Sequence, residues 1–495
     1  MLRQLLATLS SDASRPRLLK AKSSSHRRKL PRSRLCIEAL EPRTLMSATP
    51  STVYLQTNLI SDQPGVAAIT DASVANAWGL AIPPTGGNFW IADNHTGVSS
   101  VYGGNVNHSP LTKNLSDVTI PGEGPTGVVF NSTSDFVVSD GNGHSGPAAF
   151  IFVTESGTIA GWNPAVPPPA PSAAAQVGTT VTDAIYKGVA IGNNGTQNLL
   201  YAANFHTGHI DVFDTNFAAK TLAGSFTDPN LPAGYAPFNV QAIGGTLYVM
   251  YAQQDADQHD EVVGAGKGFV DKFDMNGNLL GRFASGGVLN APWGIAVAPT
   301  NFGKFSGDIL IGNFGDGRID AYRPSGLFVG ALRDAHGQPI AIDGLWALGF
   351  GNGVTAGDTN ALYFTAGPDD EAHGLFGKLA PAANLTQQTV ISGPGLKKVD
   401  FKSGHFTGTL HLHNLTKSTI TGPITIIFDK LPAGVTLNNA TGLTVDGKPF
   451  ITLTNTSIAK HKKVNVFVDF SSSSHNLGRI IVGLHRGVVV QGQFG

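Results

Sequence analysis

Five histidines follow the second short strand of a unit that recurs along the middle of the chain. Residues 44–385 contain eight histidines, and the five in these turns are His95, His144, His206, His259 and His373. Oxygen- and amide-bearing side chains lie at or beside the same strand ends, namely Asp93, Asp140, Asn204 and Asn313. Imidazole and carboxylate groups that meet at one point can hold a divalent metal ion, which activates water or polarises a carbonyl group. These turns therefore form the candidate site.

The residues of these turns leave the chemistry of the site open. Three histidines would favour Zn²⁺, whereas a ring of carboxylates and amides would favour Ca²⁺. The same residue types are common in ordinary turns, and repeats duplicate them without any function. No His-x-His or His-x-x-x-His pair occurs in residues 44–385. We therefore predict a ligand-binding face, assign no catalytic residue, and keep Ca²⁺, Zn²⁺ and no metal as alternatives.

Three tryptophans share a second position, directly before the first strand of a unit. Trp78, Trp293 and Trp346 occupy it in three units, and Thr126, Lys187 and Asn239 occupy it in the others. An indole here can pack between neighbouring sheets. Alternatively it can line the mouth of a central channel and stack on a sugar or an apolar ligand, so we include the three tryptophans in the predicted face.

The elements that must position these side chains are six repeats of short strands. Similar apolar strands begin at residues 79, 127, 188, 240, 294 and 347, so the period is near fifty residues. A second strand follows each of them (89–93, 136–140, 199–204, 247–252, 308–313 and 361–366), and a third strand follows in turn. Such a period with β character indicates the blades of a propeller. Residues 53–59 alternate apolar and polar side chains and are predicted to complete the sixth blade, so that the ring has no open seam.

The strand pattern resembles that of NHL-type six-bladed propellers. More closely, residues 54–62 (YLQTNLISD), 76–79 (NAWG) and 237–241 (PFNVQ) resemble an uncharacterised bacterial family of exported propellers. The likeness runs from about residue 52 to 380. It implies a propeller fold and an extracytoplasmic setting, and it implies no activity. In NHL-type topology the loop before the first strand and the turn after the second open on the same face, where propellers usually bind ligands.

The charges divide the chain into three segments. Residues 1–43 hold 11 basic and 3 acidic residues, residues 44–385 hold 11 and 27, and residues 386–495 hold 11 and 4. Because the phosphates of nucleic acid repel an acidic surface, the middle segment is not expected to bind nucleic acid. No run of about 18 apolar residues is present, so no transmembrane helix is expected.

Residues 1–48 are predicted to be a targeting segment. Residues 37–48 (IEALEPRTLMSA) resemble the LEPR-XLL segment of large extracytoplasmic proteins of planctomycete-type bacteria, with Leu45 and Met46 in place of the usual final leucines. The resemblance implies export or sorting to the cell envelope. At the other end, residues 386–495 show short strands separated by turns, which predicts a small immunoglobulin-like sandwich.

These observations predict an all-β chain in three parts: the targeting segment 1–48, a six-bladed β-propeller at 49–385, and the sandwich at 386–495. The predicted function is binding of a ligand or partner, a surface glycan or protein, by a monomer outside the cytoplasm. The alternative is a metal-dependent lyase or hydrolase that uses the loop His and Asp residues.

Overall fold

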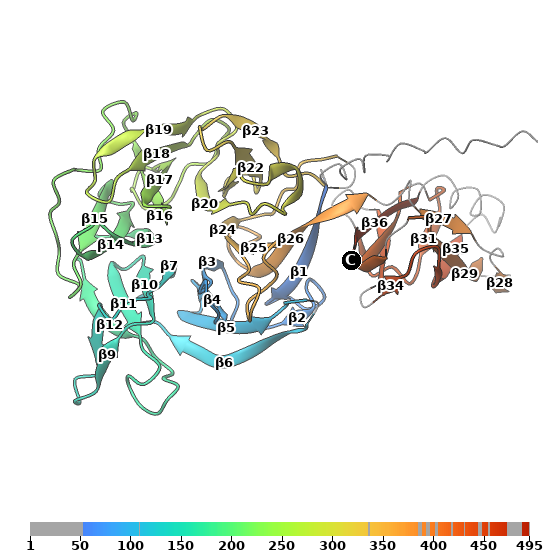
Figure 1. Cartoon of the computed structure of the whole chain (residues 1–495), viewed down its shortest axis with the longest axis horizontal. Helices are drawn as coiled ribbons and strands as arrows, with labels where there is room; N and C mark the ends of the chain where they lie inside the picture. Colours follow the sequence, from blue (N-terminus) through green and yellow to red (C-terminus); the bar gives the residue numbers. More distant parts are fainter. Residues whose placement is uncertain are drawn as a thin grey trace, which may run out of the picture. The chain divides into compact units, whose positions relative to one another are not determined.

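The structure is a computed structural model of the chain (Figure 1). It describes residues 53–384 except 108, 335 and 336, and most of residues 389–494 with short gaps. The predicted targeting segment lies outside the described residues. The described residues form β-strands and one short 3-10 helix, η1 (Gly303–Phe305), so the all-β prediction is confirmed. No helix among them is long and apolar enough to cross a membrane.

Small sheets, antiparallel apart from one short parallel pairing in the sixth, follow one another along residues 53–384. The first contains β3 (Ala77–Ala81), β4 (Phe89–Asp93), β5 (Val98–Gly104) and β6 (Leu111–Thr119), and the second β7 (Pro125–Phe130), β10 (Phe150–Thr154), β11 (Thr158–Trp162) and β12 (Gln176–Thr180). The third contains β13 (Tyr186–Asn193), β14 (Asn198–Asn204) and β15 (His209–Phe213), and the fourth β16 (Tyr235–Ile243), β17 (Thr246–Gln253), β18 (Phe269–Phe273) and β19 (Leu279–Ser285). The fifth contains β20 (Pro292–Val297), β21 (Ile309–Asn313), β22 (Ile319–Tyr322) and β23 (Phe328–Ala331). The sixth is formed by β24 (Leu345–Phe350), β25 (Leu362–Ala366), β26 (Leu375–Asn384), β1 (Val53–Ser61) and β2 (Ile69–Thr70).

The first strands of these sheets line the axis of a closed ring. Each contacts the first strand of the next sheet, and β24 contacts β3, so the series returns to its start (Figure 1). Glycine permits this close approach. A Cβ atom on Gly79 would lie 2.3 Å from the carbonyl oxygen of Thr126, and one on Gly294 would lie 2.5 Å from that of Trp346. The glycine that recurs in the first strands therefore has a steric cause.

The ends of the ring are joined by β1, as the sequence predicted. β1 pairs antiparallel with β26, from Val53 opposite Ala382 to Ser61 opposite Leu375. Tyr54 on β1 is 1% exposed and packs against Phe302 of the fifth sheet, with ring centroids 4.8 Å apart. The chain thereby pairs its early strand with a late one and leaves no open seam at this sheet.

The second sheet departs from the prediction. β7 pairs directly with β10, which therefore occupies the second place in this sheet. The predicted second strand at 136–140 instead gives β8 (Val137–Ser139), which pairs with β9 (Ser145–Pro147) in a separate hairpin. Every residue of β10 is buried, whereas Val137 of β8 is 53% exposed, and Phe136 has a φ of 58°. The more apolar strand therefore takes the interior position.

Two further sheets follow after residue 388. One contains β27 (Thr389–Ser392), β28 (Lys397–Asp400), β29 (His405–Asn414), β31 (Val435–Leu437) and β35 (Lys463–Ser472). The other contains β30 (Ile420–Phe428), β32 (Gly442–Leu443), β33 (Pro449–Leu453), β34 (Ser457–Ile458) and β36 (Val488–Phe494), and it continues the sixth sheet because β36 pairs with the end of β26. Buried residues of both sheets, such as Phe470 and Ile426, share one core. Residues 473–487 of the predicted sandwich lie outside the described residues, and the immunoglobulin-like topology stays a prediction.

Candidate functional site

A buried lysine lies among carboxylates near the axis of the ring. The side chain of Lys187, on β13, is 1% exposed, and its Nζ lies 2.5 Å from Glu155 Oε1 and 3.2 Å from Asp260 Oδ1. The same Nζ lies 5.1 Å from the centroid of the Trp78 ring. Burial alone would lower the pKa of Lys187, but the neighbouring carboxylates of Glu155 and Asp260 outweigh it and raise the pKa. Lys187 is therefore a charged ammonium held in a cage of acids and indole.

Turns of different sheets supply the acids around it. Glu155 lies in the turn between β10 and β11, and its Oε2 accepts a hydrogen bond from Asn94 Nδ2, just after β4, at 2.9 Å. Asp260 and Glu261 lie in the loop between β17 and β18. All three positions follow the second strand of a sheet, so these turns do open toward one another. We call Glu155, Lys187, His259, Asp260, Glu261 and Glu371 the central cluster.

Glu371 joins the cluster from the turn after β25. Its Oε2 accepts a hydrogen bond from Asn76 Nδ2 at 2.5 Å, and Asn76 Oδ1 accepts one from Trp346 Nε1 at 3.1 Å. Burial raises the pKa of Glu371, and the negative charges of Glu155 and Asp260 add to the rise. Asn76 is fully buried, so this contact fixes the Glu371 carboxyl at the edge of the tryptophan layer.

Glu261 holds a proton at neutral pH. Burial raises its pKa to about 8; Lys187 opposes the rise, and the charges of Glu371 and Asp260 support it. The cluster therefore contains one ammonium and four carboxyl groups, of which Glu261 is neutral. The remaining carboxylates leave an excess of negative charge that attracts a cation.

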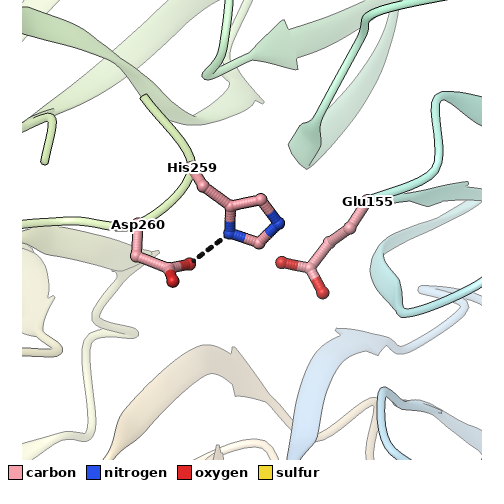
Figure 2. Close-up of side chains that lie close together, drawn as sticks. All are labelled: Glu155, His259 and Asp260. Atoms are coloured by element: carbon pink, nitrogen blue, oxygen red, sulfur yellow. Dashed lines mark hydrogen bonds and ion pairs between the residues drawn. The ribbon is translucent and has the colours of Figure 1, made fainter. Parts of the chain in front are cut away.

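One group in the cluster has the donor types of a metal site. Glu155, His259 and Asp260 each offer one atom, and these atoms lie within 4.8 Å of one another. Figure 2 shows the His259 ring lying between the two carboxylates, with its Nδ1 2.8 Å from Asp260 Oδ1. The side chains of His259 and Asp260 are 49% and 64% exposed, so water and solutes reach them.

The predicted histidines do not converge. His144 pairs with Asp140 at 2.6 Å on the β8–β9 hairpin. Residues 136–140 belong to this hairpin and do not form the second strand of the sheet, so the predicted position of His144 after a second strand was wrong. His206 Nδ1 lies 3.2 Å from the carbonyl oxygen of Gln258, and His373 Nδ1 lies 2.8 Å from Asp62 Oδ2. His95 is exposed beyond β4. Only His259 stands with the acids of the central cluster, and a ligand contact by the others stays a prediction.

Three of the four predicted polar residues at strand ends, Asp93, Asn204 and Asn313, are buried and join neighbouring strands. Asp93 Oδ2 accepts a hydrogen bond from the Ser100 backbone N–H at 2.9 Å. Asn204 Nδ2 donates to Asp211 Oδ2 and Asn313 Nδ2 donates to Asp320 Oδ2, each at 2.9 Å. In each case the partner stands seven residues later, on the third strand. These contacts explain the recurrence of Asp and Asn at the strand ends without a ligand.

The three tryptophans form one buried layer. Trp78 and Trp346 stack with centroids 3.7 Å apart, and Trp293 meets Trp346 edge-on at 5.9 Å. They are 2%, 0% and 5% exposed in that order, so their faces are covered by protein. This arrangement agrees with the packing alternative. The layer also supplies the indole that lies beside Lys187.

Sequence reasoning missed Glu155, Glu261 and Glu371, although a signal was present. Residues 44–385 contain 23 Asp and only four Glu, and three of these four lie in the central cluster. Lys187 is a second signal, because it places a charge at the position that tryptophan occupies in three other units. A rare residue type that recurs in equivalent turns was the better guide.

The comparisons with known proteins give a family and no activity. No protein-family model matches the chain. It is 33% identical over 329 residues to "Uncharacterized protein R648" of Acanthamoeba polyphaga mimivirus, a match that covers 65% of this chain and 78% of the viral protein. The chain belongs to the family of that protein. "Uncharacterized protein L690" of the same virus is 33% identical over 326 residues, which cover 65% of this chain and 84% of L690.

Several solved structures resemble the chain weakly. A protein of unknown function from Bacteroides thetaiotaomicron has a TM-score of 0.42 and 12% identity, covering 66% of this chain and 76% of that one. The calcium-binding protein regucalcin from Agrobacterium tumefaciens has a TM-score of 0.39 and 13% identity, covering 62% and 91%. A streptogramin B lyase has a TM-score of 0.36 and 11% identity, covering 66% and 96%. At these scores the likeness carries no argument about the site, and the exported bacterial family stays a prediction.

Proposed function

We propose that this chain is a six-bladed β-propeller with an immunoglobulin-like domain, and that its central cluster binds a positively charged group. The group would be carried by a surface glycan or a protein, and the chain would act as a monomer outside the cytoplasm. The observation that carries the proposal is the convergence of four carboxyl groups from three sheets around the single ammonium of Lys187.

The physical argument is one of charge and surroundings. Carboxylates next to an indole attract ammonium groups through both the Coulomb interaction and the ring quadrupole. Lys187, 99% buried, shows that this cage already holds one ammonium. Asp260 is 64% exposed and presents its carboxylate to solvent, where a second cation can reach it. The extracytoplasmic setting is supported by the resemblance of residues 37–48 and 54–62 described above.

Isothermal titration of the full chain with two matched oligosaccharides tests the proposal. Glucosamine oligomers carry amines, and N-acetylglucosamine oligomers of the same length do not. We expect binding of the amine form only, with a loss of at least tenfold in Glu371→Gln and no change in Asp140→Asn, whose carboxylate pairs with His144 on the outlying hairpin. A lysine-rich peptide serves as the protein probe. Equal binding of charged and neutral oligomers together with no binding of the peptide refutes the proposal, and so does unchanged binding in Glu371→Gln.

A metal-dependent lyase or hydrolase is the second candidate. It is favoured by the donors of Glu155, His259 and Asp260 within 4.8 Å, next to Glu261, a carboxyl group that keeps its proton and can act as a general acid. The test is turnover of a panel of lactones and aryl esters with Zn²⁺ or Ca²⁺ added. Glu261→Gln should reduce kcat roughly 100-fold while metal binding is retained. No turnover of any substrate with either ion counts against this candidate.

A further inference from the structure

We propose that the central cluster binds a divalent ion of the zinc class through Glu155, His259 and Asp260, and that the Lys187 ammonium competes with the ion for the same two carboxylates. The inference rests on the proposed function in one respect, since both place a cation at the central cluster. It adds the chemical class of the cation and an internal competitor.

The donor set selects the class of ion. One imidazole nitrogen and two carboxylates suit Zn²⁺, which takes four ligands of nitrogen, oxygen or sulfur. Ca²⁺ requires six to eight oxygen ligands, more than the two carboxylates of this group provide. Three protein donors also leave the fourth position of a tetrahedral ion open for water or a ligand.

The geometry requires only a small closure. At Zn²⁺ bond lengths of about 2.0–2.2 Å, two ligands of a tetrahedral ion lie roughly 3.4 Å apart. The donor atoms here lie within 4.8 Å, so the widest pair must approach by somewhat over 1 Å. The side chains of His259 and Asp260 are about half and two-thirds exposed, so little packing opposes a rotation of this size.

Lys187 already demonstrates the cation-binding capacity of these carboxylates. Its Nζ contacts Glu155 at 2.5 Å and Asp260 at 3.2 Å, which is the position a bound ion would claim. Two cations on the same oxygen atoms repel each other strongly in a site with little water. The ion must therefore displace the ammonium, and a variant without the ammonium must bind the ion more tightly. Lys187→Met makes this change and keeps an apolar stem beside Trp78.

Isothermal titration of the full chain with Zn²⁺ tests the inference. We expect Glu155→Gln and His259→Ala to weaken the site at least tenfold, and Lys187→Met to strengthen it about tenfold. The matched control is His144→Ala, because His144 forms a similar pair with Asp140 at 2.6 Å, while no third donor completes a metal-binding group there among the residues that the structure describes. This control should bind Zn²⁺ as the wild type does.

Two outcomes overturn the inference: unchanged Zn²⁺ binding in His259→Ala, or binding in Lys187→Met no tighter than in the wild type. If Lys187→Met does not fold, Lys187→Gln replaces it, and circular dichroism checks each variant beforehand. Absence of Zn²⁺ binding in the wild type, with binding of the amine-bearing oligosaccharide retained, refutes the metal site and leaves the proposed function standing. If the wild type binds Zn²⁺ but binds neither the amine-bearing oligosaccharide nor the lysine-rich peptide, the proposed function is refuted and the metal site stands.

Discussion

Truncation of Tyr54 tests whether β1 holds the ring closed. This side chain is 1% exposed, lies 4.8 Å from the Phe302 ring, and donates a hydrogen bond from its hydroxyl to the Phe302 carbonyl oxygen at 2.9 Å. Replacing a buried aromatic residue by alanine costs about 4 kcal/mol. For a ring of roughly 330 residues the entropy of unfolding is about 0.7 kcal/mol/K, so Tyr54→Ala should lower Tm by about 6 °C.

Two companion variants separate packing from hydrogen bonding. Tyr54→Phe removes only the hydroxyl and leaves the Phe302 carbonyl without this donor, which costs about 1 kcal/mol, or between 1 and 2 °C. Leu327→Ala is the control, because Leu327 is 67% exposed and its loss should leave Tm unchanged. Differential scanning calorimetry measures all three, with deletion of residues 49–60 as the extreme case. A Tm of Tyr54→Ala within 1 °C of the wild type would show that β1 does not stabilise the ring.

Three further predictions concern charge. Asp93→Asn should leave Tm within about 2 °C, because burial raises the pKa of Asp93 and so disfavours its charged form, and Asn can still accept the hydrogen bond from the Ser100 N–H, whereas Asp93→Ala should lose several degrees in thermal unfolding. The free energy of unfolding should fall as pH rises from 5 to 8, because Glu261 has a pKa of about 8 in the native chain and releases its proton near pH 4.5 in the unfolded chain. Glu261→Gln should reduce this fall, as measured by urea unfolding at several pH values. Lys187→Met should lower Tm at neutral pH, since Glu155 and Asp260 lose their buried counter-ion; a Tm within 1 °C of the wild type in thermal unfolding would contradict the ion-pair account.

The repeat and its closure could be predicted because steric demands recur along the chain. Gly79 and Gly294 mark first strands since a Cβ atom there would collide with the next sheet, and this demand is the same in successive units. β1 likewise pairs with β26 along its length, although its buried residues, Tyr54, Leu59, Ile60 and Ser61, do not follow the alternation of residues 53–59. Local patterns of this kind depend on backbone geometry, which the sequence reports directly.

The residues of the central cluster could not be predicted in the same way, because they depend on the order of the strands within each sheet. The strand at 136–140 fitted the spacing of the repeat, yet the fully apolar β10 pairs with β7 and sets the hairpin of Asp140 and His144 aside. That single displacement moves Glu155 into the turn where His144 was expected. Tertiary competition between two candidate strands therefore decided which side chain reaches the axis.

The contrast between histidine and glutamate in this chain has a physical basis. A histidine in a turn gains a local partner easily, as the carboxylate of Asp140 beside His144 and that of Asp260 beside His259 show, so its recurrence needs no shared site. A glutamate in a turn lacks that local advantage, because its longer side chain hydrogen-bonds poorly to the adjacent backbone and prefers helices. Most acidic residues of residues 44–385 are aspartates, so a glutamate in three equivalent turns indicates that a longer side chain is needed there to contact its partner. The contact of Glu155 with Lys187 and that of Glu371 with Asn76 are made by such reach toward the axis.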